Sequence, residues 1–226
     1  MLKIDYDAII AGSGATIECD HEIIEENTLS KEESEYLTKY LLDRNIPANF
    51  ESSTKIYANQ FTKDTMLKKV EEQCKGKSEE EKAKHGLTIL TNQITVVNSL
   101  EGLSYNKVSV IDNGKTPYKT IQDDLSDRYV VIPATFAPLG KESGEITSFK
   151  INKATGMDSV IRYFNADIKD TIAIGDGFND LPMFEKAHLS VAMGNAPQEI
   201  KDKADRITTS LDEDGVYNAF KELKLI

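Results

Sequence analysis

The residues with the clearest chemical potential lie in the segment 171–183, which reads TIAIGDGFNDLPM. A short apolar run leads directly into a polar loop that holds Asp176, Asn179 and Asp180. Carboxylates grouped on one loop suit a hard cation such as Mg²⁺, which takes one or two protein carboxylates and completes its shell with water and substrate oxygens. The same residues also fit an Asp-Gly turn in which Asp180 caps the next helix. Both interpretations stay open at this point.

A second candidate is Lys153, which lies in the sequence INKATG at 151–156. It stands between an expected strand and an expected helix. A lysine at such a junction can hold a phosphate as a point charge, while the N-terminus of the helix adds partial positive charge. The alternative is a solvated lysine without a role.

The elements around these residues predict an α/β fold. Strands are expected at 171–174, 189–192 and 206–209, with helices at 180–187 and 197–204 between them. This βαβ rhythm is typical of a parallel sheet, and ligands of such sheets bind beyond the carboxyl ends of the strands. The loop with Asp176 follows the first of these strands, so the order of elements favours a binding site there.

Other parts of this region follow from apolar spacing. Residues 7–15 read as a buried parallel strand and its exit loop, and 144–149 as another strand. Two amphipathic helices are also expected. Their inward positions are Met157, Val160, Ile161 and Phe164 for one helix, and Val216, Ala219, Phe220 and Leu223 for the last helix.

The middle of the chain predicts an α+β module of its own. A hairpin is expected around Asp20-His21, and Ser30 with Glu33 forms the capping box of a helix. Strands at 107–111 and 128–133 alternate with helices at 63–74 and 115–125. The run Lys75–Lys84 mixes charges of both signs and predicts a solvated helix or loop without function.

Together, these segments resemble the C-terminal part of Cof-type phosphatases of the haloacid dehalogenase (HAD) superfamily. The resemblance consists of a lysine, a helix, a strand and GDGFND, followed by VAMGNAP and DEDGV, from about residue 145 to 216. Residues 7–15 are similar to the strand and loop that enter a C2-type cap in this family. The resemblance implies a HAD-like Rossmannoid parallel sheet, N-terminally incomplete, from residues 1–15 and 136–226, with an α+β cap at 16–135.

The resemblance also implies roles for single residues. Lys153 would orient the phosphate, Asp176 would bind Mg²⁺, and Asp180 would hold either the water shell of the metal or the lysine. Asn179 would belong to the same phosphate-binding site. The implied activity is a Mg²⁺-dependent phosphatase that acts on small phosphorylated metabolites such as sugar phosphates. Members of this family transfer the phosphoryl group to an aspartate of a DxDGT-type motif and then hydrolyse the acyl phosphate.

The sequence departs from the family at that motif. No DxDGT or DxDGS occurs, and the superficial match Asp5-Tyr6-Asp7-Ala8 lacks the Gly-Thr turn. The Ser or Thr of the second family motif is also absent, and Ser13 stands where many relatives have Asn. We therefore expect these 226 residues to be inactive alone, with self-association through the incomplete sheet. The alternative function is a non-catalytic phosphate-binding, metal-binding or regulatory protein that keeps Lys153 and Asp176.

Composition excludes several other classes. The net charge of −11 argues against a nucleic-acid partner, and no apolar run reaches the length of a membrane span. The two cysteines, Cys19 and Cys74, indicate neither a disulfide framework nor a zinc site, and we expect a cytoplasmic protein. The residues His21, His85 and His188 have no partner at metal-ligand spacing. The glycines in Gly12-Ser13-Gly14 are not followed by the helix of a dinucleotide-binding fold.

Overall fold

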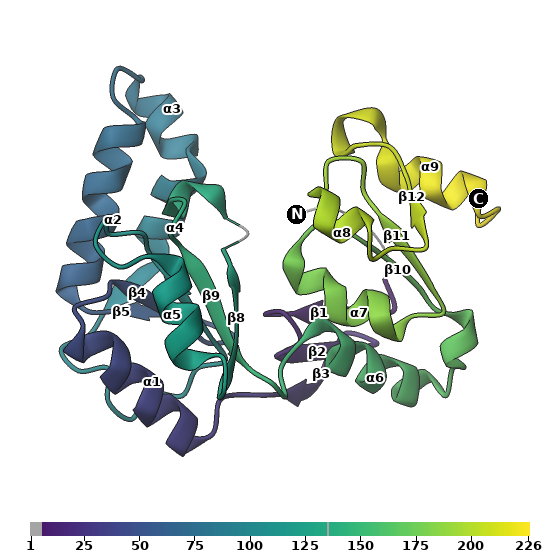
Figure 1. Cartoon of the computed structure of the whole chain (residues 1–226), viewed down its shortest axis with the longest axis horizontal. Helices are drawn as coiled ribbons and strands as arrows, with labels where there is room; N and C mark the ends of the chain where they lie inside the picture. Colours follow the sequence, from purple (N-terminus) through teal and green to yellow (C-terminus); the bar gives the residue numbers. More distant parts are fainter. Residues whose placement is uncertain (1–5, 135) are drawn as a thin grey trace. The chain divides into compact units, whose positions relative to one another are not determined.

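The structure is a computed structural model that describes residues 6–134 and 136–226. The chain divides into two compact units (Figure 1). The discontinuous unit consists of Met1–Glu26 and Ile151–Ile226, and the inserted unit consists of Asn27–Lys150. We had expected the boundaries after residues 15 and 135. The two compact units divide after residues 26 and 150 instead, and strand pairing accounts for this division.

The discontinuous unit is an α/β arrangement of short elements. Its strands are β1 (Ala8–Ala11), β2 (Thr16–Cys19), β3 (Glu22–Glu26), β10 (Ile172–Gly175), β11 (Leu189–Ala192) and β12 (Arg206–Ile207). Its α-helices are α6 (Lys153–Phe164), α7 (Leu181–Lys186), α8 (Gln198–Lys201) and α9 (Gly215–Glu222). Short 3₁₀ turns occur at η2 (Ile168–Asp170), η3 (Phe178–Asp180) and η4 (Leu211–Glu213).

The strands β10, β11 and β12 form the parallel sheet that the βαβ rhythm predicts. Gly175 of β10 lies opposite Ala192 of β11, so both strands end at the same level. Helices α7 and α8 contribute Phe184 and Ile200 to a buried apolar cluster with this sheet. The register therefore places the loops that follow the strands side by side.

The strand β1 does not join that sheet among the described residues. It pairs antiparallel with β2, which pairs antiparallel with β3. The intervening turn holds Gly12, Ser13 and Gly14 at positive φ, and this left-handed conformation reverses the chain at once. The prediction of a parallel strand at 7–15 is therefore wrong, whereas the hairpin around Asp20-His21 is confirmed. Because β2 pairs with β1 and β3 pairs with β2, residues 16–26 belong to the discontinuous unit.

Helix α6 packs on this antiparallel sheet through its small residues. Gly156 and Ser159 are buried, and a methyl group on Gly156 would lie 2.5 Å from Cγ2 of Ile10. Phe164, which was predicted to point inward, is 40% exposed. Apolar spacing therefore predicted the position of the helix in the sequence, but not its contact face. That face contains the small residues, which allow the helix backbone to approach the sheet closely.

The inserted unit contains a six-stranded sheet in the order β6-β5-β4-β7-β9-β8. Its strands are β4 (Ala48–Glu51), β5 (Ile56–Ala58), β6 (Ile94–Val96), β7 (Lys107–Val110), β8 (Tyr129–Pro133) and β9 (Gly144–Ser148). Its helices are α1 (Lys31–Asp43), α2 (Gln60–Gln73), α3 (Glu79–Lys84), α4 (Gly86–Gln93), α5 (Tyr118–Leu125) and the turn η1 (Ala137–Leu139). Strand β9 pairs with β7 and β8, so residues 136–150 belong here and not to the parallel sheet.

Local signals in this unit are largely confirmed. Ser30 and Glu33 form the predicted capping box at the start of α1. Helix α3 carries no buried residue, as expected for the charged run around it. Both cysteines are free and buried, and burial is the main factor that raises the pKa of the Cys19 thiol.

One face of the sheet in the inserted unit holds a buried charge cluster of Glu51, Lys107 and Glu145. The ammonium group of Lys107 lies 3.2 Å from Glu51 Oε2 and 3.3 Å from Glu145 Oε2. Burial alone would lower the pKa of Lys107, but the two carboxylates outweigh burial and raise it. The lysine is therefore charged in the folded protein and holds the two carboxylates together.

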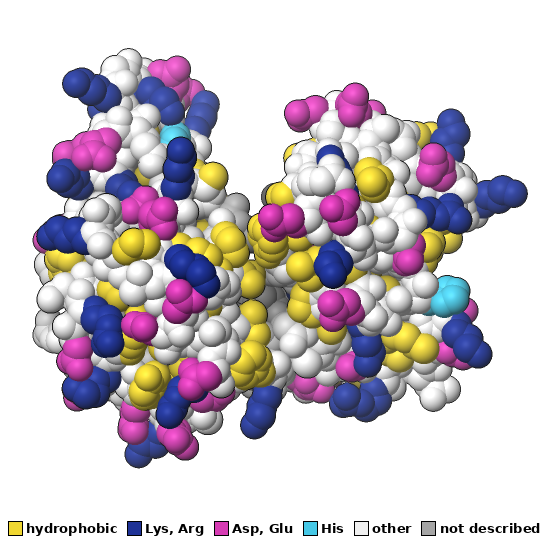
Figure 2. All heavy atoms as spheres, viewed as in Figure 1, with side chains coloured by type: hydrophobic (Ala, Val, Ile, Leu, Met, Phe, Trp, Pro, Cys, Tyr) yellow, Lys and Arg dark blue, Asp and Glu magenta, His cyan; other side chains and the backbone are white. Residues whose placement is uncertain are grey.

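Charged side chains of both signs occur on the surface of the protein (Figure 2). On the face shown in Figure 2, acidic and basic side chains are interspersed, without a continuous basic area. Within residues 6–134 and 136–226, no helix combines the length and the apolar character needed to cross a bilayer.

Candidate active site

The candidate site lies at the carboxyl ends of the parallel strands. Three loops meet there, and backbone hydrogen bonds join them: Met193 N–H donates to Gly175 O at 2.9 Å, and Gly194 N–H donates to Thr209 O at 2.9 Å. A methyl group on Gly194 would lie 2.6 Å from Ser210 N, so only glycine permits this approach. The sheet therefore fixes the backbone from which the polar side chains project.

Asp180 is the buried anchor of the first loop. One of its oxygens, Oδ2, accepts hydrogen bonds from Asp176 N–H and Gly177 N–H, both at 2.9 Å. A methyl group on Gly175 would lie 2.4 Å from the same oxygen. Asp180 thus folds the loop around its own carboxylate, and the glycine makes room for it.

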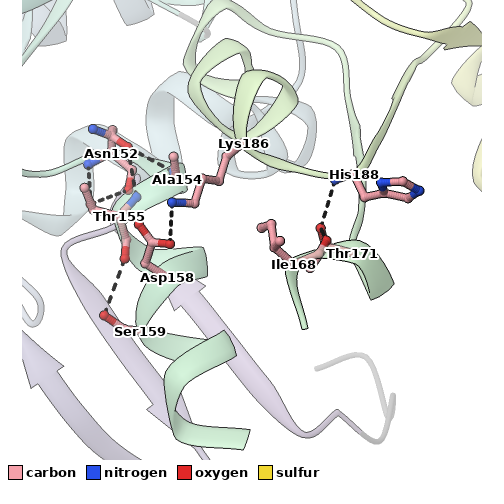
Figure 3. Close-up of polar contacts among 9 residues, drawn as sticks. All are labelled: Asn152, Ala154, Thr155, Asp158, Ser159, Ile168, Thr171, Lys186 and His188. Atoms are coloured by element: carbon pink, nitrogen blue, oxygen red, sulfur yellow. Dashed lines mark hydrogen bonds and ion pairs between the residues drawn. The ribbon is translucent and has the colours of Figure 1, made fainter. Parts of the chain in front are cut away.

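Lys153 contacts the other oxygen of this carboxylate, Asp180 Oδ1. The lysine is the first residue of α6. Its position is set by the preceding Asn152, whose side chain accepts hydrogen bonds from Ala154 N–H at 2.9 Å and Thr155 N–H at 3.0 Å (Figure 3). The side chain of Asp180 is 4% exposed and that of Lys153 is 30% exposed, so the ammonium group also reaches the surface.

A second ion pair ties the same two helices together. Lys186 of α7 lies 2.7 Å from Asp158 of α6, and both side chains are about 40% exposed (Figure 3). On the other side of α7, Thr171 Oγ1 accepts a hydrogen bond from His188 N–H at 3.0 Å. These contacts join α6 to α7 and the segment after α7 to the residue before β10.

Asp176 is exposed and points to the second loop. Its Oδ2 accepts a hydrogen bond from Asn195 Nδ2 at 2.7 Å, and Asn195 Oδ1 accepts one from Leu211 N–H at 3.1 Å. The sequence interpretation gave Asn195 no role. The available signal was its place just after β11, because neighbouring parallel strands bring the residues that follow them together.

The structure thus joins three of the four predicted site residues in one network, namely Lys153, Asp176 and Asp180. Asn179 lies in the same turn, but among the described residues its side chain forms no hydrogen bond with the other three. Among the described residues, no group of three or more His, Cys, Asp or Glu could hold a metal. A Mg²⁺ ion that takes one or two carboxylates plus water is compatible with that finding. The exposed carboxylate of Asp176 fits it, whereas both oxygens of Asp180 already accept protein donors.

A parallel α/β sheet with a lysine and two aspartates at its carboxyl edge defines the class of protein. Residues 1–220 match the family of haloacid dehalogenase-like hydrolases, and the chain belongs to this family. The solved structure of the HAD subclass IIB sugar phosphatase BT4131 is similar, with a TM-score of 0.74 and 20% identity over 98% of this chain and 77% of that chain. This likeness confirms the predicted HAD-like α/β fold.

Two curated relatives from Bacillus subtilis (strain 168) are also similar. Phosphatase YwpJ is 36% identical over 89 residues, which are 39% of this chain and 31% of that protein. The 5-amino-6-(5-phospho-D-ribitylamino)uracil phosphatase YitU is 34% identical over 134 residues, which are 58% of this chain and 50% of that protein. The matching region thus spans about a third to a half of these relatives.

Proposed function

We propose that this protein is a phosphoric-monoester hydrolase that acts on small phosphorylated metabolites such as sugar phosphates. The observation that carries the proposal is the network of Lys153, Asp180 and Asp176 at the carboxyl edge of the parallel sheet. Membership in the haloacid dehalogenase-like hydrolases and the phosphatase names of two relatives support it. The sugar phosphatase with a similar fold agrees with this substrate class.

Each residue has a distinct part in the proposal. Lys153 binds a phosphate oxygen with the donors that Asp180 leaves unused, because an ammonium group has three. Asp180 is a positioning residue, since the lysine and two backbone N–H groups occupy its carboxylate. Asp176, with Asn195 orienting it, would hold Mg²⁺. Asp180 could bind the ion only if its carboxylate lost its contact with Lys153 or with a backbone N–H group. A bound Mg²⁺ supplies positive charge that stabilises the transferring phosphoryl group. Asn179 remains a predicted phosphate contact.

The phosphoryl acceptor of the family, an aspartate in a DxDGT-type motif, does not occur in these 226 residues. We therefore propose that the chain supplies the lysine and the metal ligand, and that hydrolysis needs an aspartate from a further segment. We also propose that the discontinuous unit corresponds to the catalytic core and the inserted unit to the C2-type cap. The cytoplasmic location stays a prediction from the sequence.

A phosphate-release screen tests the main proposal. A longer chain that includes the upstream codons should release phosphate from a set of sugar phosphates in the presence of Mg²⁺, and residues 1–226 alone should not. Asp176→Asn should abolish release, whereas the control Asp158→Asn, at the exposed pair with Lys186, should retain it. Absence of release by the longer chain, or full activity of Asp176→Asn, contradicts the proposal.

The alternative function is binding without hydrolysis. The absent DxDGT motif favours it for the chain as it stands. Titration calorimetry of residues 1–226 should then show binding of Mg²⁺ or of a phosphate ester, and Lys153→Ala should weaken the binding of the phosphate ester. Binding with no turnover in the longer chain would support the alternative over the hydrolase.

We further propose that residues 1–226 self-associate through the open side of the parallel sheet. Ile172 and Ile174 of β10 line a pocket of about 500 Å³ together with Val216 and Phe220 of α9. Val216 is 48% exposed and Phe220 37% exposed, although the sequence predicted both to point inward. Uncovered apolar side chains beside a strand edge favour pairing with a second chain.

Sedimentation and hydrogen exchange test this association. We expect a concentration-dependent dimer or a larger species, with weak amide protection in β10 and β1 at low concentration. A monomer at all concentrations, with strong protection of both strands, would show that the fold closes without a partner.

A further inference from the structure

One pocket lies in the inserted unit, and none of its lining residues belongs to the candidate active site. It has a volume of about 570 Å³ and is formed by the end of α1, the outer side of α2 and the loop after β7. Three cationic side chains line it: Arg44, Lys68 and Lys115. No carboxylate lines it among the described residues, although acidic residues outnumber basic ones by 38 to 27 in the chain. This local excess of positive charge needs an explanation.

The arginine is held in place before any ligand arrives. The guanidinium carbon of Arg44 lies 4.0 Å above the ring of Tyr40, and its Nε is 3.8 Å from Asp124 Oδ2. Tyr40 also donates a hydrogen bond to this carboxylate at 2.8 Å. An arginine that is stacked and tethered loses little side-chain freedom when it binds an anion.

The loop after β7 is ordered as well. Asn113 Oδ1 accepts hydrogen bonds from Lys115 N–H at 2.9 Å and Thr116 N–H at 3.0 Å. Gly114 N–H donates to Asp112 Oδ1 at 2.8 Å, with Gly114 at a φ of +68°. The two side chains thus close a tight turn that presents Lys115 and Thr116 to the pocket.

Helix α2 contributes one face with three kinds of group. Phe61, Thr65 and Lys68 are spaced at i, i+4 and i+7, so they lie on the same side of the helix. Phe61 is 49% exposed, so part of its ring is accessible to a ligand. The pocket therefore combines an apolar platform with a hydroxyl group and three cations.

Neither Lys68 nor Lys115 forms an ion pair with a carboxylate within the ranges that the structure describes. Of the three cations only Arg44 has a carboxylate partner, Asp124, and a dianion in the pocket reduces the repulsion among the three. Arginine and lysine donors match phosphate oxygens, and an aromatic face adds contact with an apolar group. We propose that this pocket binds a small organic phosphate, with the phosphate among the three cations and an apolar group against Phe61.

Phenyl phosphate is a suitable probe because it has both features. Titration of the 226-residue chain should shift the backbone amide resonances of Thr65 and Thr116 in a saturable way. The double variant Lys68→Gln/Lys115→Gln should bind about tenfold more weakly or worse, since it removes two charge-assisted contacts. Phe61→Ala should weaken the binding of phenyl phosphate but leave the binding of inorganic phosphate unchanged.

The control variant is Lys82→Gln/Lys84→Gln, which makes the same change in net charge on α3, where both lysines are ion-paired. It should bind as the unaltered chain does. Resonances of Thr65 and Thr116 report on this pocket, and those near Lys153 report separately on the candidate active site. Absence of saturable shifts at Thr65 and Thr116, or equal binding by the pocket variant and the control, would overturn the proposal.

Discussion

Replacement of Asp180 by asparagine tests the central contact of the candidate site. The carboxylate accepts two backbone hydrogen bonds through one oxygen and contacts Lys153 through the other. An asparagine side chain has one oxygen and one NH₂ group. Whichever way it is turned, the NH₂ group faces donors, either the ammonium group of Lys153 or the N–H groups of Asp176 and Gly177.

The size of the effect follows from burial. A buried donor left without an acceptor costs about 1–3 kcal/mol, and removal of one partner from a fully buried ion pair costs about 3–5 kcal/mol. Lys153 is 30% exposed, so water can hydrate its ammonium group when the partner is lost. The expected loss of unfolding free energy therefore lies between these limits, at about 3 kcal/mol. The control Asp158→Asn removes the pair with Lys186, which is about 40% exposed on both sides, and should cost less than about 1 kcal/mol.

Urea unfolding gives the overall loss of stability, and hydrogen exchange assigns it to the loop. The amides of Asp176 and Gly177 donate to the replaced carboxylate, so their protection should fall far more in Asp180→Asn than in Asp158→Asn. A double-mutant cycle with Lys153→Met should give a coupling energy of at least about 1 kcal/mol. Equal destabilisation by the two aspartate variants, with unchanged protection of both amides, would refute the reasoning.

Three further predictions concern stability, each measured by denaturant unfolding. Lys107→Met removes the ammonium group that contacts both Glu51 and Glu145 and should cost about 3 kcal/mol, whereas Lys119→Met at an exposed pair should cost less than about 1 kcal/mol. Burial raises the pKa of Glu33, but hydrogen bonds from its partners outweigh burial and lower it below the ordinary value of 4.5. Its contribution to stability is therefore present above pH 4.5 and is lost as the pH falls through the lowered pKa, and Glu33→Gln should remove that part of the pH dependence. Gly156→Ala should destabilise by about 1–3 kcal/mol, despite the higher helix propensity of alanine, because its methyl group would meet Ile10. An equal loss for both lysine variants, an unchanged pH profile, or a more stable alanine variant would contradict these predictions in turn.

The parallel part of the fold could be predicted from sequence because its signals are local. Each short apolar strand is followed by a polar loop and a helix, and this order alone requires parallel neighbours. Parallel strands end at one edge, so residues that follow different strands come together. This rule could have identified Asn195, which follows β11 and donates to Asp176 after β10.

The rest of the fold depends on which strands pair and which faces pack together, and no local sequence pattern specifies these contacts. Apolar alternation identifies 8–11 and 144–148 as strands, but it does not show that the first pairs with β2 and the second with β7. For this reason the sequence pattern did not indicate that the compact units divide after residues 26 and 150. The contact face of α6 was missed because Gly156 and Ser159 are not apolar, although their small size permits the closest packing.

The turn at Gly14 has a consequence for the order of folding. A methyl group there would lie 2.0 Å from the carbonyl oxygen of Asn152, so the backbones of these two residues are in contact. The whole inserted unit lies between them in the sequence. This contact closes a loop that contains residues 27–150, and the entropy of closure grows with the logarithm of loop length, by about 0.6 kcal/mol for each doubling. A chain in which the inserted unit is already compact has a much shorter effective loop. Early collapse of residues 27–150 therefore accelerates formation of the unit that carries Lys153 and Asp176, and the discontinuous unit is expected to fold last.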